Sequence, residues 1–275
     1  MEMYELYAIR YAESEQRRRR ENFMHPVPEP PDGVMPMEYF VWAAVGKGRT
    51  ILIDTGVDAK ILTERGSEFI RCPTDGLWRL KIDPGEIDTV ITTHLHWDHA
   101  GNIEKFPKAR FHLQKREIEH VTGPCMSNSF LKRPFDTDQV CTFIRMLHED
   151  RVVLHDGEAE IAPGITVHRT GGHTPGLQCV RVMTRRGWVV VASDVLHYYA
   201  NYELNTPFSV AVDVTEYMEA LSLVYRLAES PEHVIAGHDP AVSRMYPAVS
   251  PQLEGIAVRL DVTPRPRNEA EKISG

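Results

Sequence analysis

Long apolar runs are missing from this sequence, since no stretch approaches the roughly 20 consecutive apolar residues that a membrane-spanning helix needs. The segment from residue 1 to 10 contains two glutamates and lacks the apolar stretch of a secretory signal. Cysteine is scarce as well, with four residues and no CxxC spacing, which argues against a disulfide framework or a zinc knuckle. These absences predict a cytoplasmic protein that does not enter a membrane.

An excess of positive charge is also missing. The 31 basic residues are outnumbered by 39 acidic ones, for a net charge of −8, so a nucleic-acid partner is not expected. A basic run from Arg17 to Arg20 is followed by Glu21 and is typical of a solvated helix face or a subunit contact. Together with the proline-rich segment at residues 23–37, it is a candidate contact in a homodimer.

The chain has 275 residues, of which 42% are hydrophobic, enough for one large α/β domain or two small ones. No segment has the composition of a linker, so we predict one domain over residues 1–275 with a loose tail after about residue 262. Short β-branched runs, several of them separated by helical segments, predict strands. These runs lie at residues 40–45, 50–53, 89–92, 110–113, 165–168 and 188–192.

The clearest helix is predicted over residues 213–230. Apolar residues recur there at helical spacing, Asp213 and Glu216 have the spacing of a capping box, and a Ser-Pro pair would end the helix. Residues 23–37 and 121–138 are rich in turn-forming residues, and both segments are predicted to be loops or lids.

The strongest chemical signal is an HxHxDH motif at residues 94–99, which directly follows an apolar strand. Alternate residues of an extended segment project to one side, so His94 and His96 are expected to lie together. Asp98 and His99 are expected in the turn and the first residues of a helix. Imidazole nitrogens and carboxylate oxygens are suitable ligands for zinc, manganese, iron or cobalt.

Three more ligand-type residues also follow short apolar strands. His173 lies in Gly-Gly-His-Thr-Pro-Gly, Asp194 follows the run at residues 188–192, and His238 lies in Gly-His-Asp-Pro. Because sites in α/β sheets assemble at the carboxyl ends of strands, these residues are expected to join the HxHxDH motif. A single histidine at a strand end is usually structural, and we assign that role to the other histidines. Four such segments together favour a metal site.

These motifs, in this order, resemble those of the metallo-β-lactamase superfamily over residues 40–246. The resemblance implies an α/β fold, namely an αβ/βα sandwich of two mixed β-sheets flanked by helices. It also implies two divalent metal ions per chain, zinc first, with manganese, iron or cobalt as alternatives. By motif position, one metal would be held by His94, His96 and His173, the other by Asp98, His99 and His238, and Asp194 would bridge the two.

The same resemblance implies that Asp54, which precedes Thr55-Gly56, orients a ligand histidine without binding metal itself. Gly171 is a departure, since the family often has proline at that position. As for mechanism, a hydroxide that bridges the metals would attack the substrate carbonyl, and Asp98 would deliver a proton to the leaving group.

Within the superfamily, the chain is similar to N-acyl homoserine lactonases in size, in its strand-like residues 4–9 and in the long helix before Gly-His-Asp-Pro. That similarity implies hydrolysis of a small-molecule lactone. Those lactonases place a lactone-contacting tyrosine three residues after the bridging aspartate, where this chain has His197, followed by Tyr198 and Tyr199. Either a tyrosine is displaced by one position, or the pocket serves a different substrate, with His197 as the candidate contact.

Other functions stay open. Another cyclic ester, a cyclic amide or a carboxylic ester could be the substrate of the same centre. A persulfide dioxygenase-like oxidoreductase would use the same fold with a single iron, although the full ligand set for a second metal disfavours it. A metal-binding module without activity is the least favoured alternative. Six aromatic residues on predicted loops could line an acyl-chain groove, but packing is the simpler interpretation of each: Trp97, Phe130, Phe135, Tyr198, Tyr199 and Phe208.

Overall fold

Two β-sheets form the centre of the protein in the computed structural model, which describes residues 2–27 and 33–267. The first sheet contains eight strands. Its order is β13 (Ala257–Arg259), β1 (Glu5–Ser14), β2 (Met37–Gly46), β3 (Arg49–Ile53), β5 (Thr89–Ile91), β6 (Arg110–Gln114) and β7 (Val152–His155), with β4 (Glu68–Phe69) paired to β1. The pairs from β3 to β7 are parallel, whereas the pairs that involve β1 or β2 are antiparallel.

The second sheet has five strands. Its order is β12 (Val234–Ala236), β11 (Gly187–Ser193), β10 (Gln178–Thr184), β9 (Ile165–Arg169) and β8 (Ala159–Ala162). Strands β11 and β12 are parallel, and the other pairs are antiparallel. The core lies largely along these sheets, where β2 is buried over residues 37–44 and β11 over residues 189–193. All six strands predicted from β-branched runs are present in the two sheets.

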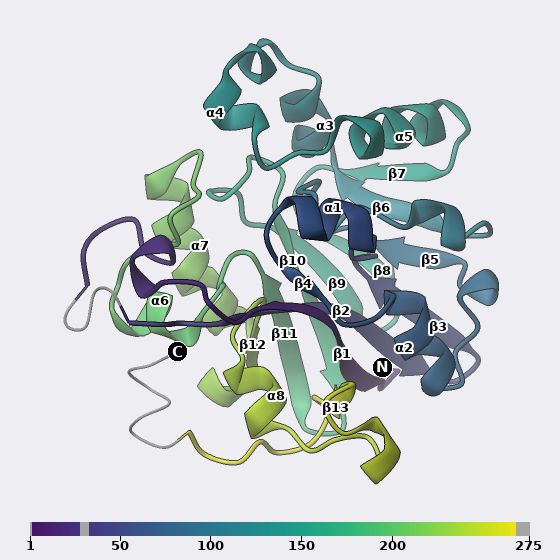
Figure 1. The fold of residues 1–275 in the computed structure, drawn as a ribbon. Helices are drawn as coiled ribbons and strands as arrows, with labels where there is room; N and C mark the ends of the chain where they lie inside the picture. Colours follow the sequence, from purple (N-terminus) through teal and green to yellow (C-terminus); the bar gives the residue numbers. More distant parts are fainter. Residues whose placement is uncertain (1, 28–32, 268–275) are drawn as a thin grey trace.

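Helices pack against both sheets (Figure 1). The α-helices are α1 (Ala59–Glu64), α2 (Pro73–Arg79), α3 (Lys115–Val121), α4 (Ser129–Lys132), α5 (Thr137–His148), α6 (Tyr199–Glu203), α7 (Val214–Leu227) and α8 (Ala241–Met245). The 3₁₀ helices are η1 (Arg19–Glu21), η2 (Pro84–Glu86), η3 (Ile103–Lys105), η4 (Pro124–Ser127), η5 (Pro231–His233) and η6 (Pro251–Leu253). Helices α2 and α5 contact β1 and β7 of the first sheet, and α7 contacts β11 of the second. The result is the αβ/βα sandwich that the resemblance implies.

The predicted helix over residues 213–230 is α7, which ends three residues earlier than expected, at Leu227. The Asp213 carboxylate accepts a hydrogen bond from Glu216 N at 2.9 Å, as a capping box requires. The Glu216 side chain does not complete the box, because it accepts hydrogen bonds from Arg169 at the end of β9 and from Gly172 N on the loop that follows. The capping residue was therefore predicted correctly, and its partner has a tertiary role instead.

The predicted loops and tail are only partly described. Residues 28–32 of the proline-rich segment and residues 268–275 of the tail lie outside the described residues. The segment at residues 121–138 contains η4 and α4, so it is more helical than the loop we predicted. Within the described parts of the chain, we find no helix with the length and apolar character needed to cross a lipid bilayer.

Candidate metal centre

The HxHxDH motif leaves β5 as an extended segment, which brings its first two histidines together. The rings of His94 and His96 have centroids 4.5 Å apart, and both side chains are buried. Between them, Leu95 N donates a hydrogen bond of 3.0 Å to the carboxylate of Glu117 on α3. The extended geometry expected from the sequence is confirmed.

Asp98 and His99 lie in a turn, which a hydrogen bond of 3.0 Å from His99 N to His96 O closes. The expectation that these residues begin a helix is wrong. Gly101 N donates instead to Gly56 O at 2.8 Å, so the segment is tied to the end of β3, and the next helical residues are those of η3.

The other proposed ligands follow β9, β11 and β12. His173 lies in a loop where Gly171 and Gly172 have φ angles of 69° and 83°. Proline is restricted to φ near −65°, so the proline that the family often has could not adopt this conformation at residue 171. Asp194 directly follows β11, and His238 is two residues beyond β12. All three side chains are buried.

The carboxylate of Asp194 lies between two groups of histidines. Its Oδ1 is 3.1 Å from Nε2 of both His99 and His238, and its Oδ2 is 3.1 Å from Nε2 of His173. Side chains whose ligand atoms lie within 4.8 Å of one another form three groups: His94, His96, His173 and Asp194; Asp98, His99 and His238; and Asp194, His197 and His238. The first two groups match the division between two metals that the resemblance implies.

Three of the histidines are held through Nδ1, which leaves Nε2 facing the centre. Nδ1 of His99 is 2.8 Å from Asp54 Oδ2, Nδ1 of His173 is 2.8 Å from Val210 O, and Nδ1 of His238 is 2.9 Å from Glu38 O. An imidazole that donates from Nδ1 presents its Nε2 lone pair as a ligand. The contact of Asp54 with a histidine agrees with the orienting role expected for it.

The chemistry of the group fits a divalent metal ion. Nε2 of His94 is buried and has no hydrogen-bond partner among the residues described, which is costly unless an ion satisfies it. Burial, together with the neighbouring imidazoles, lowers the pKa of His94 and of His96 well below its usual value, so both rings are neutral, as metal ligands must be.

Negative charge is concentrated around His99. Burial alone would lower the pKa of His99, but the carboxylates of Asp194 and Asp98 outweigh it and raise the pKa well above its usual value. For Asp194 itself, burial raises the pKa, but nearby imidazoles, that of His197 foremost, lower it well below its usual range, so the carboxylate is ionised at neutral pH. Such a cluster favours a bound cation.

His197 lies against Asp194, at a distance of 2.9 Å from its Nε2 to Asp194 Oδ2. Its Nδ1 is 3.1 Å from the hydroxyl of Tyr217, and its ring stacks on Phe208 with centroids 3.6 Å apart. Burial lowers the pKa of His197 to about 3, although Asp194 opposes this effect. His197 therefore belongs to the centre by position.

The two tyrosines after His197 do not take the place of the family's tyrosine. The hydroxyl of Tyr198 donates to Pro36 O and that of Tyr199 to Val234 O, both at 3.1 Å. The tyrosine hydroxyl that does reach this part of the centre belongs to Tyr217 on α7, which donates to Asp194 O at 2.8 Å. Tyr217 lies on the buried face of α7, and its position in the sequence did not indicate a role in the site.

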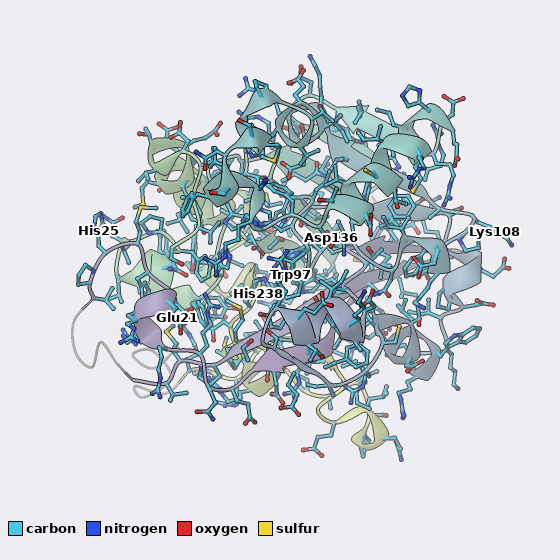
Figure 2. The ribbon with its side chains drawn as sticks, turned by 45° about the horizontal axis from the view of Figure 1, so that its top comes forward. Glu21, His25, Trp97, Lys108, Asp136 and His238 are labelled. Carbon is cyan, nitrogen blue, oxygen red and sulfur yellow. The ribbon has the colours of Figure 1, made fainter. Side chains whose placement is uncertain are left out.

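A cavity of about 790 Å³ opens over the cluster. Trp97, Phe130, Phe135 and Phe208 line it, so the packing role that we preferred for these four is not their only one. Tyr198 and Tyr199 are buried and are not among its lining residues. Figure 2 shows Trp97 and His238 near the middle of the molecule, and the ring of Tyr39 contacts both, with centroids 5.9 and 5.2 Å away.

The basic run at residues 17–20 is not uniformly solvated. Arg19 is buried, with its guanidinium 5.3 Å from the ring centroid of Phe23, and Arg17 lines the cavity with its guanidinium 5.3 Å from the ring of Phe208. The prediction of a solvated face is wrong for Arg19, and Arg17 is half-buried, because contact with aromatic rings covers part of both side chains. The alternative, a subunit contact, stays a prediction. Arg18 and Arg20 are exposed, as predicted.

The fold and this cluster define an αβ/βα sandwich protein with a candidate divalent metal centre at the carboxyl ends of its strands. Residues 36–238 match the family model of the metallo-beta-lactamase superfamily. The chain therefore belongs to this superfamily.

Curated relatives are N-acyl homoserine lactonases. AiiB of Agrobacterium fabrum is 29% identical over 213 residues, which cover 69% of this chain and 75% of the relative. An N-acyl homoserine lactonase of a Bacillus species is 29% identical over 134 residues, 48% of either chain. Against that Bacillus enzyme and others like it, the chain spans about half of the relative's length.

Solved structures share the fold at lower identity. An N-acyl homoserine lactone hydrolase with N-hexanoyl-L-homoserine bound at its catalytic metal centre is 19% identical, with a TM-score of 0.70 over 89% of this chain and 96% of the other. AidC, a dizinc quorum-quenching lactonase, is 14% identical, with a TM-score of 0.66 over 87% and 91% of the two chains.

Proposed function

We propose that this protein is a dinuclear metal-dependent hydrolase that opens the ester bond of a lactone, with N-acyl homoserine lactones as the first substrates to test. The observation that carries the proposal is the Asp194 carboxylate, whose two oxygens face different groups of imidazoles. The lactonase relatives support the substrate class. Zinc is the metal we expect, with manganese, iron or cobalt as alternatives.

Divalent ions bound here would supply a nucleophile from water at neutral pH and polarise the substrate carbonyl. In this proposal, His94, His96 and His173 hold one ion, and Asp98, His99 and His238 hold the other. Asp194 contributes to both sites. The lactone would lie in the cavity, with its acyl chain against the aromatic wall that includes Trp97.

Asp98 is the proposed proton carrier of the reaction. It borders the cavity, and its Oδ2 lies 3.5 Å from His99 Nε2 and 3.7 Å from His238 Nε2. Its main-chain carbonyl accepts a hydrogen bond of 2.6 Å from the hydroxyl of Tyr11, which fixes the backbone of the turn. A carboxylate held in this way can take a proton from the attacking water and deliver it to the leaving alkoxide.

A second candidate function is hydrolysis of another cyclic ester, a cyclic amide or a carboxylic ester at the same centre. His197 favours it, because both ring nitrogens already face Asp194 and Tyr217. This histidine does not offer the hydroxyl that the lactonase tyrosine would present.

A quorum-quenching role depends on the lactone assignment. The cytoplasmic location, the single domain over residues 1–275 and the homodimer stay predictions from the sequence.

The test is to measure metal content and hydrolysis on the same preparation. We expect about two metal ions per chain and acid release from N-acyl homoserine lactones in a pH-drop assay. If the protein binds two ions and hydrolyses other esters but no lactone, the second candidate function is supported instead. A single iron with oxygen consumption would point to a persulfide dioxygenase-like oxidoreductase and contradict the proposal.

A further inference from the structure

Glu117 is a buried carboxylate outside the proposed ligand set that binds two separate segments of the centre. It lies on α3, and its side chain is fully buried. Its Oε1 accepts a hydrogen bond from Leu95 N at 3.0 Å. Its Oε2 accepts hydrogen bonds from Thr174 Oγ1 at 2.7 Å and from Gly176 N at 3.1 Å. One side chain thus satisfies three donors.

Two of the three donors are chain neighbours of the ligands proposed for one metal. Leu95 stands between His94 and His96, and Thr174 follows His173. His96 and His173 are 77 residues apart in the sequence, yet His96 Nδ1 and His173 Nε2 lie 2.9 Å from each other. The Glu117 carboxylate is therefore a direct link between the two segments that supply these imidazoles.

The close approach of α3 to the His173 loop depends on a glycine. A Cβ atom added at Gly176 would lie 2.2 Å from Glu117 N and 2.6 Å from Glu117 Cα, distances that atoms do not tolerate. Glycine at this position of the Gly-His-Thr-Pro-Gly segment therefore has a physical reason, because any other residue would push α3 away. The contact therefore depends both on the Glu117 carboxylate of α3 and on the glycine at residue 176 of the His173 loop.

We propose that Glu117 is a positioning residue that fixes the distance between the HxHxDH segment and the His173 loop. It thereby controls the affinity of the site that His94, His96 and His173 form. A buried carboxylate with three donors is a stiff connection, since moving either segment would leave a buried donor without its partner. This inference rests on the proposed metal centre and is independent of the choice of substrate.

The test is Glu117→Gln in the full chain. The amide has one oxygen and one NH₂ group, so it cannot accept hydrogen bonds from both segments. We expect the dissociation constant of one zinc ion to rise about 10- to 100-fold, while that of the other ion changes little. Competition with a chromophoric chelator measures both constants, and the visible spectrum of the cobalt-loaded protein reports the ligand geometry.

Asp261→Asn is a matched control, because the Asp261 carboxylate is also buried and binds Arg259 and Arg185 away from the cluster. It should lower the melting temperature without changing either zinc constant. Thr174→Val and Thr174→Ser form a second pair, in which valine removes the hydroxyl donor and serine keeps it. Weaker zinc binding is expected for valine alone.

Unchanged zinc constants and cobalt spectra in both Glu117→Gln and Thr174→Val would overturn the proposal. An equal rise in the dissociation constants of both zinc ions would also overturn it, because that result indicates a general loss of structure. If Glu117→Gln does not fold, the Thr174 pair decides. Should the unmodified protein bind two ions and hydrolyse no lactone, the proposed function would fail while the zinc measurements still test Glu117.

Discussion

The carboxylate of Asp54 lies 2.8 Å from Nδ1 of His99, and both side chains are buried. The same carboxylate accepts hydrogen bonds from Thr93 N at 2.7 Å and from Thr93 Oγ1 at 2.8 Å. Asp54 has a φ angle of 59°, a left-handed conformation that aspartate and asparagine tolerate better than most residues. Asp54 therefore orients a proposed ligand and ties the end of β3 to the start of the HxHxDH segment.

Asp54→Asn should weaken metal binding about 10- to 100-fold, because asparagine keeps the backbone conformation but loses the charge and an acceptor oxygen. A zinc competition titration measures the change. Asp150→Asn is the matched control, since Asp150 is exposed and has a similar φ angle of 57°. Equal zinc affinity in the two variants would show that Asp54 does not support the centre.

Asp194→Asn should abolish hydrolysis and remove at least one metal ion, because the amide cannot give two anionic oxygens to two ions. His96→Ala should have the same effect by removing one imidazole from a group of four ligand side chains. We expect kcat/KM to fall more than about 100-fold, beyond what loss of an outer contact costs. Elemental analysis and a pH-drop assay measure both effects. A variant with both metals and full activity would refute the assignment.

His197→Ala should change the kinetics while both metal ions stay bound. The ring contacts Asp194 and Phe208 at the edge of the cavity, so its loss alters the surface that receives the substrate. We expect kcat/KM to fall about 10-fold, the effect of roughly 1.4 kcal/mol. His197→Tyr introduces the tyrosine that the N-acyl homoserine lactonases have at this position, and it should raise kcat/KM for lactones relative to other esters. Identical kinetics for all accepted substrates would leave His197 with a packing role.

Cys179 should resist thiol reagents in the native protein. It is fully buried on β10, and burial raises the pKa of its thiol to about 12, so little thiolate forms at neutral pH. Cys141 is exposed and should react first. Labelling with a chromogenic disulfide, followed by peptide mass spectrometry, locates the modified residues. Native-state labelling of Cys179 as fast as that of Cys141 would contradict the structure.

The His112–His155 pair should make stability depend on pH. Nδ1 of His112 lies 2.9 Å from Nε2 of His155, and burial, followed by the effect of His155, lowers the pKa of His112 to about 4. Between pH 6.5 and 4 the unfolded chain binds a proton that the folded chain excludes. The free energy of unfolding is therefore highest above this window and decreases as the pH is lowered through it.

His112→Gln tests this dependence, because glutamine keeps a hydrogen-bonding group and does not titrate. The loss of unfolding free energy between pH 7 and 5 should be smaller in the variant by about 1 kcal/mol, after allowance for a partly exposed side chain. Urea titrations at both pH values measure it. Parallel pH profiles for the two proteins would exclude His112 as a source of acid sensitivity.

Local sequence was sufficient to predict most of the strands and to find the ligand-type residues that the structure brings together. The HxHxDH motif spans only six residues, which lie in an extended segment and a turn. The convergence of His94 and His96 therefore follows from strand geometry alone. The last part of that segment was mispredicted, because Gly101 N binds Gly56 O and not a helical partner. That contact joins residues far apart in the chain, and hydrophobic periodicity carries no information about it.

By itself, the sequence determined the family, the order of the ligand-type residues and the sheet-forming segments, because each of these depends on residue type and short-range spacing. Only the tertiary structure decided which side chains surround the ligands. Glu117 lies in an ordinary helical segment, and Tyr217 lies on a helix face that faces the core, yet both contact the centre. Their roles arise from the packing of α3 and α7 against distant loops, which single-chain patterns do not encode.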